Sequence, residues 1–217
     1  CTFLKAQTQG GVAQQDYDAL VAIYDELDGA NWVNKTNWLS GNVSTWYGVN
    51  VELGRVVKIE LPFNKLSGRI PSEIKNLTEL KSLDLSYNQI VQNLPSGITN
   101  LTKLEALYLQ ENDIQGTIPS DIGNITGLKK ISLAGNLFTD KIPDSFWTLK
   151  NLVNVSFYSN RLQGEIPEAI GNLTELMVLR LENNQLEGPL PMNLWNLDQL
   201  VRLQLAQNNF RGQIVSN

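Results

Sequence analysis

Hydrophobic and polar positions along most of this chain follow a pattern that returns every 24 residues. Leucine-like residues occupy the first, fourth and sixth positions of each unit and an asparagine the ninth, as in Leu80, Leu83, Leu85 and Asn88. The asparagine occurs at seven places, each 24 residues after the one before: Asn64, Asn88, Asn112, Asn136, Asn160, Asn184 and Asn208. A period of this length is typical of a solenoid, in which successive coils stack and bury one continuous apolar column.

Within each unit the pattern predicts a short strand, a turn and a returning arc. Around Leu83-Asp84-Leu85 the side chains alternate, so the leucines point inward and the residues between them face outward. The asparagine amide can both donate and accept, and we expect it to satisfy backbone groups of neighbouring coils. An Ile-Pro or Leu-Pro pair follows in six units, and its proline restricts the arc. The strands then lie side by side as a parallel sheet on one face.

These units resemble the plant-type class of the leucine-rich repeat family, which reads L-x-x-L-x-L-x-x-N-x-L-S-G-x-I-P-x-x-I-G-x-L. Residues 64–71, Asn-Lys-Leu-Ser-Gly-Arg-Ile-Pro, match this pattern fully, and the resemblance covers about residues 49–217. It implies an α/β fold, a right-handed solenoid with a parallel sheet on its concave face and an N-terminal helical cap. Gln92 and Asp140 replace the glycine of the class. We expect them to alter the arc locally without breaking the period.

The pattern changes before the repeats begin. Apolar residues recur at helical spacing over about residues 16–28, and Asp28-Gly29 ends the run. Three tryptophans follow, Trp32, Trp38 and Trp46, and residues 49–61 predict a hairpin that leads into the first repeat. Because a solenoid must cover its first apolar layer, the tryptophans are interpreted as an end cap, with a carbohydrate-stacking site as the alternative. The chain is thus divided into a signal remnant or flexible segment (1–15), a cap (16–55) and seven repeats (56–217).

The predicted cap also resembles that of plant-type repeat proteins, in which D-x-x-A-L precedes W-x-G-V. Residues 16–20 and 46–49 match these two motifs. The cysteine pair usual in the plant cap is missing, and Ser44-Thr45 stands just before Trp46. This departure favours a secreted protein of a bacterium, Bacteroidetes-like, or of a protist over a plant receptor ectodomain.

Composition narrows the range of functions. The chain has a net charge of −5 without a basic block, which argues against nucleic acid as a partner, and no apolar run long enough to span a membrane. It has no histidine and a single cysteine, so Ser-His-Asp, Cys-His and Cys/His zinc sites are excluded, and we expect neither metal nor cofactor. Glu60 and Asp84 occupy equivalent positions in adjacent repeats, and we interpret them as a solvated acidic patch rather than a catalytic pair.

The two ends of the sequence raise separate expectations. Cys1 is part of a signal-peptide remnant, a lipid anchor or neither, and the first two imply a secreted or cell-surface protein. The last coil stops without a polar cap, so either the chain is part of a longer protein or this uncapped end self-associates.

Candidate binding residues are the outward-facing strand positions that the repeat does not dictate. Three aromatic and three acidic residues form a first patch in the N-terminal half: Phe63, Tyr87, Tyr108, Glu60, Asp84 and Glu111. A smaller mixed patch comprises Tyr158, Arg180 and Glu182, and the small residues Ser132, Ala134 and Gly135 leave a gap between the two. Aromatic residues among polar ones are typical of protein-binding hot spots.

These features predict a non-catalytic recognition scaffold that binds a protein or peptide on its concave face. The first alternative is a cell-surface glycan-binding module, with the same tyrosines stacking on sugar rings. A second is an enzyme inhibitor resembling the polygalacturonase-inhibiting proteins, which rests on fold-level analogy alone. An ice-binding surface is disfavoured because it needs a flat array of Thr or Asn, and this strand face is too varied.

Overall fold

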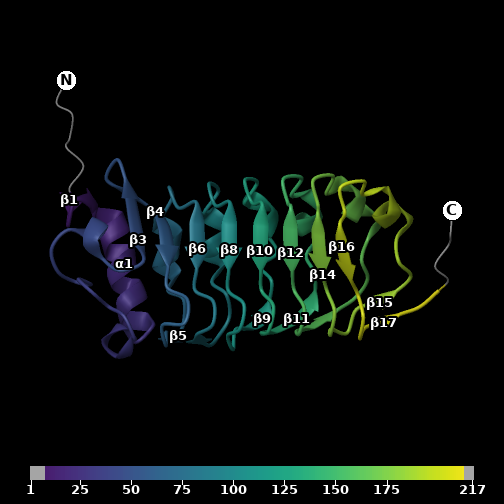
Figure 1. Cartoon of the computed structure of the whole chain (residues 1–217), viewed down its shortest axis with the longest axis horizontal. Helices are drawn as coiled ribbons and strands as arrows, with labels where there is room; N and C mark the ends of the chain where they lie inside the picture. Colours follow the sequence, from purple (N-terminus) through teal and green to yellow (C-terminus); the bar gives the residue numbers. More distant parts are fainter. Residues whose placement is uncertain (1–7, 213–217) are drawn as a thin grey trace, which may run out of the picture.

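The computed structural model describes residues 8–212, so Cys1 and its predicted anchor or signal remnant lie outside the described residues. Within this range the chain forms an elongated stack of coils with a helical cap at the N-terminal end (Figure 1). One long sheet runs along the stack in the order β16-β14-β12-β10-β8-β6-β4-β3. Its strands are β3 (Val49–Glu52), β4 (Arg55–Glu60), β6 (Ser82–Asp84), β8 (Ala106–Tyr108), β10 (Lys130–Ser132), β12 (Asn154–Ser156), β14 (Val178–Arg180) and β16 (Arg202–Gln204).

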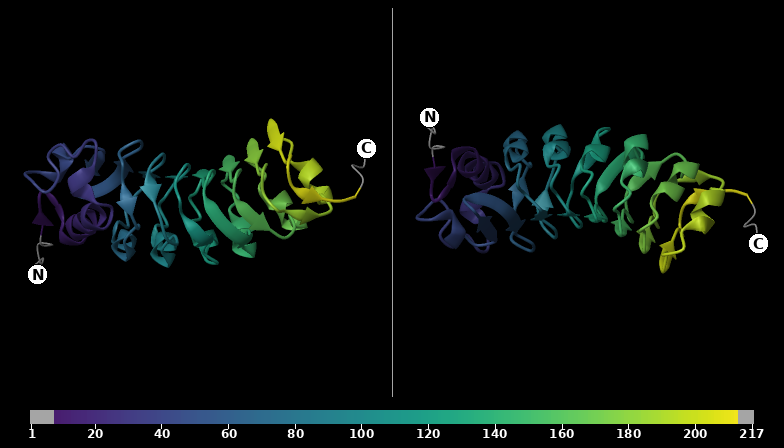
Figure 2. Two further views of the ribbon diagram at one scale, coloured as in Figure 1. Left: turned by 90° about the horizontal axis from the view of Figure 1, so that it is seen from below. Right: turned by 90° about the horizontal axis from the view of Figure 1, so that it is seen from above.

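The register of the long sheet follows the 24-residue period. From β4 to β16 all neighbours are parallel, and each residue pairs with the one 24 positions later, as Glu60 does with Asp84. The stack curves, and the long sheet lines its concave side (Figure 2). The predicted solenoid with a parallel sheet is therefore confirmed. Its consequence for function is that each exposed column of the repeat becomes a straight row of side chains across the concave face.

Short 3-10 helices return the chain on the opposite side of each coil. They are η3 (Ser72–Asn76), η4 (Ser96–Asn100), η5 (Ile122–Asn124), η6 (Asp144–Thr148), η7 (Glu168–Asn172) and η8 (Met192–Asn196). In all but η5 the repeat's proline is the residue directly before the helix. A fixed φ near −65° suits a helix start, where the missing N–H is not needed. None of the helices within residues 8–212 has the length and apolarity that a membrane crossing requires.

Further short strands lie between the long-sheet strand and the 3-10 helix of the coils. The sequence pattern did not predict these strands. They form three small parallel groups: β5 (Ser67–Gly68) with β7 (Gln89–Ile90); β9 (Gln115–Thr117), β11 (Leu137–Lys141) and β13 (Arg161–Gln163); and β15 (Glu187–Gly188) with β17 (Asn209–Phe210). Most have only two or three residues, too few for a period to appear in sequence. They add backbone hydrogen bonds between coils.

The repeat asparagines form the hydrogen-bonded ladder that the sequence predicts. Asn136 is 5% exposed, and its Nδ2 donates to the carbonyls of Leu109 (2.9 Å) and Leu133 (3.0 Å). Its Oδ1 accepts from the backbone N–H of Ile114 at 3.0 Å. Equivalent bonds recur at the other repeat asparagines from Asn88 to Asn208. Each asparagine thus joins its own coil to the preceding one.

The cap consists of a hairpin, one α-helix and two 3-10 turns. These are β1 (Thr8–Gln9) and β2 (Val12–Ala13), α1 (Gln14–Glu26), η1 (Gly29–Asn31) and η2 (Val43–Thr45). The helix begins and ends two residues before the predicted 16–28, because Leu27 caps it and Asp28 takes a left-handed φ of 58°. The predicted hairpin is confirmed as the antiparallel pair β3 and β4.

Aromatic packing fills the cap. Trp32, Trp38 and Trp46 are at most 7% exposed, and Trp38 lies 4.8 Å from Trp32 and 4.9 Å from Trp46 between ring centroids. All three belong to the same apolar core as the repeat leucines. Because their faces are covered, the end-cap interpretation is confirmed and stacking of sugars on these tryptophans is excluded.

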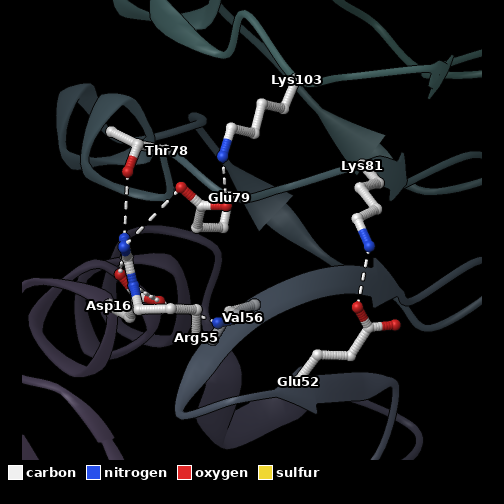
Figure 3. A network of polar contacts seen from close by, with 8 residues as sticks. All are labelled: Asp16, Glu52, Arg55, Val56, Thr78, Glu79, Lys81 and Lys103. Carbon is white, nitrogen blue, oxygen red and sulfur yellow. Dashed lines mark hydrogen bonds and ion pairs between the residues drawn. The ribbon is translucent and has the colours of Figure 1, made fainter.

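A buried carboxylate attaches the helix to the first repeat (Figure 3). Asp16 is fully buried and accepts hydrogen bonds from Arg55 Nε (3.0 Å), Arg55 Nη2 (2.9 Å) and the backbone N–H of Val56 (2.8 Å). Arg55 also reaches Thr78 Oγ1 at 3.0 Å in the next coil. The cap is thereby fixed to β4, the first strand of the parallel series.

Candidate functional site

The centre of the concave face is built from side chains on β8, β10, β12 and β14. Register places Tyr108, Ser132, Ser156 and Arg180 in one row, each beside the next. Neighbouring parallel strands lie about 4.8 Å apart, so Tyr108 and Arg180 are about 14 Å apart, and the two short serines between them leave the space above their strands open. Of the small-residue gap predicted to separate the two patches, Ser132 therefore lines a depression, whereas Ala134 and Gly135 do not.

This depression is a pocket of about 320 Å³. Its lining includes three tyrosines, three cationic side chains and several amides and hydroxyls: Tyr87, Tyr108, Tyr158, Lys130, Arg180, Arg202, Gln110, Asn154, Ser132, Ser156, Ile131 and Val178. The structure thus brings together four of the predicted residues, Tyr87, Tyr108, Tyr158 and Arg180, around one pocket. They come from both of the patches that the sequence separated.

Tyr158 and Arg180 on one wall of the pocket form a fixed group with Glu182, which does not line the pocket. The guanidinium of Arg180 lies 4.1 Å from the ring centroid of Tyr158. Arg180 Nη2 also donates to Glu182 Oε1 at 2.6 Å. Both contacts restrict the conformation of the Arg180 side chain, which in turn holds the Tyr158 ring in place. A ligand that packs on this ring therefore causes little further loss of side-chain entropy.

Burial affects the tyrosines beside the pocket. Desolvation, followed by the charge of Asp84, raises the pKa of Tyr108 above its ordinary value. Desolvation, followed by the charge of Glu111, raises the pKa of Tyr158 as well. Both hydroxyls therefore stay protonated at neutral pH and can donate hydrogen bonds to a ligand.

Phe63 and Tyr87 form a stacked pair at the rim of the concave face. Their ring centroids are 4.2 Å apart with an interplanar angle of 8°. Phe63 is 68% exposed and Tyr87 is 42% exposed. Only Tyr87 reaches the pocket, so Phe63 extends the aromatic surface from the pocket toward the cap.

The remaining predicted residues do not line the pocket. Glu60 is engaged by Lys58 at 2.6 Å, and Asp84 Oδ1 accepts from the backbone N–H and hydroxyl of Ser86 at 3.0 and 2.6 Å. Glu111 lies close against Gly135, where a Cβ would meet its carboxylate at 2.6 Å. The acidic part of the first patch is thus largely held by its own neighbours.

Sequence reasoning missed several lining residues: Gln110, Lys130, Asn154, Val178 and Arg202. Four of them occupy outward-facing strand positions and Gln110 follows the end of β8, so their exposure was predictable. Their convergence was not, because it depends on which side chains lean into the gap. The signal that points to them is the run of small residues at 132–135, which marks where longer neighbours can meet.

Two buried acceptors beside this face have no hydrogen-bond partner within residues 8–212. They are Gln110 Oε1, in the pocket lining, and Glu182 Oε2. Buried polar atoms are normally paired, and an unpaired acceptor favours a ligand that brings a donor.

A larger pocket of about 410 Å³ lies away from the concave strands, beside the end of α1. Arg69 and Glu26 both line it and pair with each other, with Nε and Oε2 2.8 Å apart. Because its charged groups satisfy each other, we favour the concave pocket as the functional site. Within the described residues no group of three or more His, Cys, Asp and Glu side chains is arranged to hold a metal ion.

The comparison with known families agrees with this geometry. The leucine-rich repeat region family matches residues 59–157, and the leucine-rich repeat family matches residues 151–173 and 175–197. The chain belongs to the leucine-rich repeat family. Together these matches cover β8, β10, β12 and β14, and Arg202 on β16 lies beyond them. No curated protein sequence matches this leucine-rich repeat chain significantly.

Solved leucine-rich repeat structures from plants are similar to the chain. The ectodomain of the membrane receptor kinase GASSHO1/SCHENGEN3 from Arabidopsis thaliana is 35% identical, with a TM-score of 0.78, over 80% of this chain and 21% of that one. The ectodomain of the Arabidopsis receptor kinase HAESA is 30% identical, with a TM-score of 0.82, over 93% and 34%. A plant ice-binding protein is 27% identical, with a TM-score of 0.86, over 94% and 66%. The chain therefore spans about a fifth to a third of the length of these receptor ectodomains.

Proposed function

We propose that this leucine-rich repeat domain is a non-catalytic recognition module that binds a peptide, or a peptide-like segment of a protein, over the concave pocket. The observation that carries the proposal is the convergence of Tyr87, Tyr108 and Tyr158 with cationic side chains in one open depression. Aromatic side chains with restricted rotamers are the groups that dominate binding energy at protein interfaces. The pocket is open, no carboxylate lines it, and the nearby Glu60 and Asp84 are engaged by Lys58 and Ser86, which favours binding over acid–base chemistry.

Related solved complexes support a peptide as the ligand. The GASSHO1/SCHENGEN3 ectodomain was solved with CASPARIAN STRIP INTEGRITY FACTOR 2, and the plant peptide hormone receptor RGFR1 with RGF2. HAESA was solved with the peptide hormone IDA and the co-receptor SERK1. By analogy with these ectodomains we propose that the present chain also works outside the cell, secreted or at the cell surface.

The test removes two of the three tyrosines that line the pocket. The double substitution Tyr87→Ala/Tyr108→Ala is expected to weaken partner capture by at least 30-fold, since hot-spot tyrosines contribute about 2 kcal/mol or more. Alanine keeps the Cβ at Tyr87, whose φ is 56°, so no new backbone strain arises. Capture is measured by pull-down from the extracellular and surface fraction of the native host, with mass spectrometry of the retained material.

The control variant is Tyr47→Ala. Tyr47 is 39% exposed but lies in the cap, before β3. It should leave capture unchanged, and circular dichroism should show that all variants stay folded. Equal capture by the wild type and the double variant would place the site elsewhere. Retention of a secreted enzyme would put the domain in the inhibitor class.

Glycan binding is the second candidate, favoured by the exposed Phe63–Tyr87 stack. Sugar rings pack on open aromatic faces, and Phe63 offers one at the rim. Titration with a polysaccharide panel decides between the two, because a glycan ligand would change intrinsic fluorescence and a Phe63→Ala substitution would abolish the change. A flat response with every polysaccharide would leave the peptide proposal alone.

The source of the chain is a proposal of the same kind. Ser44-Thr45 occupies the position where the plant cap has its cysteine pair. We therefore propose a bacterial or protist origin. Sequencing of the gene with its flanking regions tests it, since neighbouring genes of clear plant ancestry would contradict it.

A further inference from the structure

The cationic side chains on the long sheet divide into two groups. Arg55, Lys58 and Arg180 form ion pairs with Asp16, Glu60 and Glu182 at 2.9, 2.6 and 2.6 Å. Lys130 on β10 and Arg202 on β16 make no ion pair within residues 8–212, and both line the concave pocket. Among the cations on the described strands of the long sheet, only Lys130 and Arg202 thus lack a carboxylate partner, and both line the pocket.

Cations beside the sheet follow the same rule. At the turns before the strands, Lys81 pairs with Glu52, Lys103 with Glu79 and Lys129 with Glu105, at 2.8, 2.6 and 2.8 Å. Figure 3 shows the first two of these pairs beside the cap. Lys129 directly precedes Lys130, yet only Lys129 has a carboxylate partner. Within residues 8–212, the lysines at the turns before the strands therefore have carboxylate partners, whereas Lys130 in the pocket lining has none.

The pocket is consequently positive in an acidic chain. Its lining holds three cations and no carboxylate, and only Arg180 is compensated by a neighbour. The chain as a whole has a net charge of −5. Local charge opposite to that of the whole molecule attracts a ligand of the complementary sign and orients it.

The spacing of the two free cations favours an extended chain over a small anion. Register puts Lys130, Asn154, Val178 and Arg202 in one row. The ends of this row are three strands, or about 14 Å, apart. An extended peptide advances about 3.3 Å per residue, so side chains at positions i and i+4 are about 13 Å apart and point the same way.

Resting on the proposed peptide function, we infer that the segment seated over the pocket is acidic, with carboxylates that contact Lys130 and Arg202. The hydroxyls of Tyr108 and Tyr158 add donors to the same anionic segment. Between the two cations Val178 offers an apolar contact and Asn154 a polar one. Lys130 and Arg202 then determine which peptides bind, while the tyrosines supply affinity for any peptide.

The test is selection from a phage-displayed library of random peptides on the full chain. Wild-type domain is expected to enrich Asp and Glu at least threefold over the unselected library. The variant Lys130→Glu/Arg202→Glu should lose this enrichment and select Lys and Arg instead. The matched control Lys75→Glu/Lys150→Glu changes the net charge equally at two exposed positions outside the pocket, and should select the same acidic peptides as the wild type.

Affinities of one selected acidic peptide complete the test. Binding to Lys130→Glu/Arg202→Glu should fall at least 100-fold, and binding to the wild type should weaken as salt rises. Peptides that need Tyr87 and Tyr108 but show no acidic enrichment would overturn this inference and leave the proposed function intact. Failure to select any peptide, or displacement of the peptides by polygalacturonate with tighter binding of the polysaccharide itself, would overturn both.

Discussion

At the scale of single residues, the repeat imposes left-handed backbone at fixed positions. The residue before each repeat asparagine has a positive φ, from Phe63 at 53° to Gln207 at 57°. A second such position follows the turn, where Gly116 and Gly164 have φ values of 78° and 76°. Gln92 and Asp140 take this second position with φ of 68° and 65°. The expectation that they alter the arc is therefore wrong at the level of φ, because neighbouring coils hold them in the glycine conformation.

Strain at Gln92 leads to a stability prediction. A non-glycine residue in left-handed backbone destabilises the folded state by about 1–2 kcal/mol. Glycine removes this strain, but part of the gain is lost because glycine makes the unfolded chain more flexible. Gln92→Gly should therefore stabilise the domain by about 0.5–1 kcal/mol, measured by urea denaturation. Asp140→Gly should gain less, because Asp140 Oδ1 accepts from the backbone N–H of Lys141 at 2.8 Å. Unchanged or lower stability of Gln92→Gly would contradict the argument.

At the scale of elements, the cap depends on one buried ion pair as well as on its aromatic core. Helix α1 contacts β4 through Asp16, which satisfies both Arg55 and an N–H of the strand. Behind it, Gly68 in β5 approaches the end of α1 so closely that a Cβ would meet the carbonyl of Glu26 at 2.1 Å. Helix and first coil are thus joined at both ends of α1.

Loss of the Asp16 carboxylate should weaken the attachment of the cap to the first repeat and lower the stability of the domain. Asp16→Ala removes the acceptor of two Arg55 N–H groups and of the Val56 N–H and leaves Arg55 with only Glu79, at 4.0 Å, as a carboxylate partner within residues 8–212, so it is expected to cost about 3 kcal/mol in thermal or urea unfolding. Asp18→Ala is the matched control, because Asp18 is exposed and, among residues 8–212, accepts a side-chain hydrogen bond only from Gln14, at 2.8 Å. The double variant Asp16→Ala/Arg55→Ala should be less destabilised than the sum of the single variants. An additive result would show that the two side chains act independently.

At the scale of the whole molecule, stability passes from coil to coil along the stack. Each coil contacts mainly its two neighbours, so the folded state is close to a one-dimensional series of interfaces. The asparagine ladder runs through this series with one rung per coil. A break in the middle should therefore separate the molecule into two units that unfold separately.

Asn136 is the rung that tests this picture. Asn136→Ala leaves the buried N–H of Ile114 without a partner and removes one of the two amide donors to each of the carbonyls of Leu109 and Leu133, at a cost of about 3 kcal/mol. Urea unfolding should change from one transition to two, or show a reduced slope. Asn50→Ala serves as the control, since Asn50 is exposed on β3 and should leave a single transition unchanged. A lower midpoint with an unchanged single transition would mean that the stack unfolds as one unit.

The sequence by itself determined the solenoid, its parallel sheet, the asparagine ladder and the buried cap. These features follow from the strict 24-residue period. Every coil must bury the same positions against the next coil, so neighbouring strands pair with an offset of one whole repeat. Exposed columns are fixed in the same way, so Tyr87, Tyr108, Tyr158 and Arg180 could be named as surface residues in advance.

Only the tertiary structure decided which exposed residues meet. Stacking brings β8 and β14 within reach across two short serines, and side-chain length then lets Lys130 and Arg202 join the tyrosines while Glu60 and Asp84 turn to nearer partners. The 24-residue period by itself does not distinguish one exposed column of side chains from another. Ion pairing and side-chain packing, which depend on distances between coils, select the few positions that form the pocket.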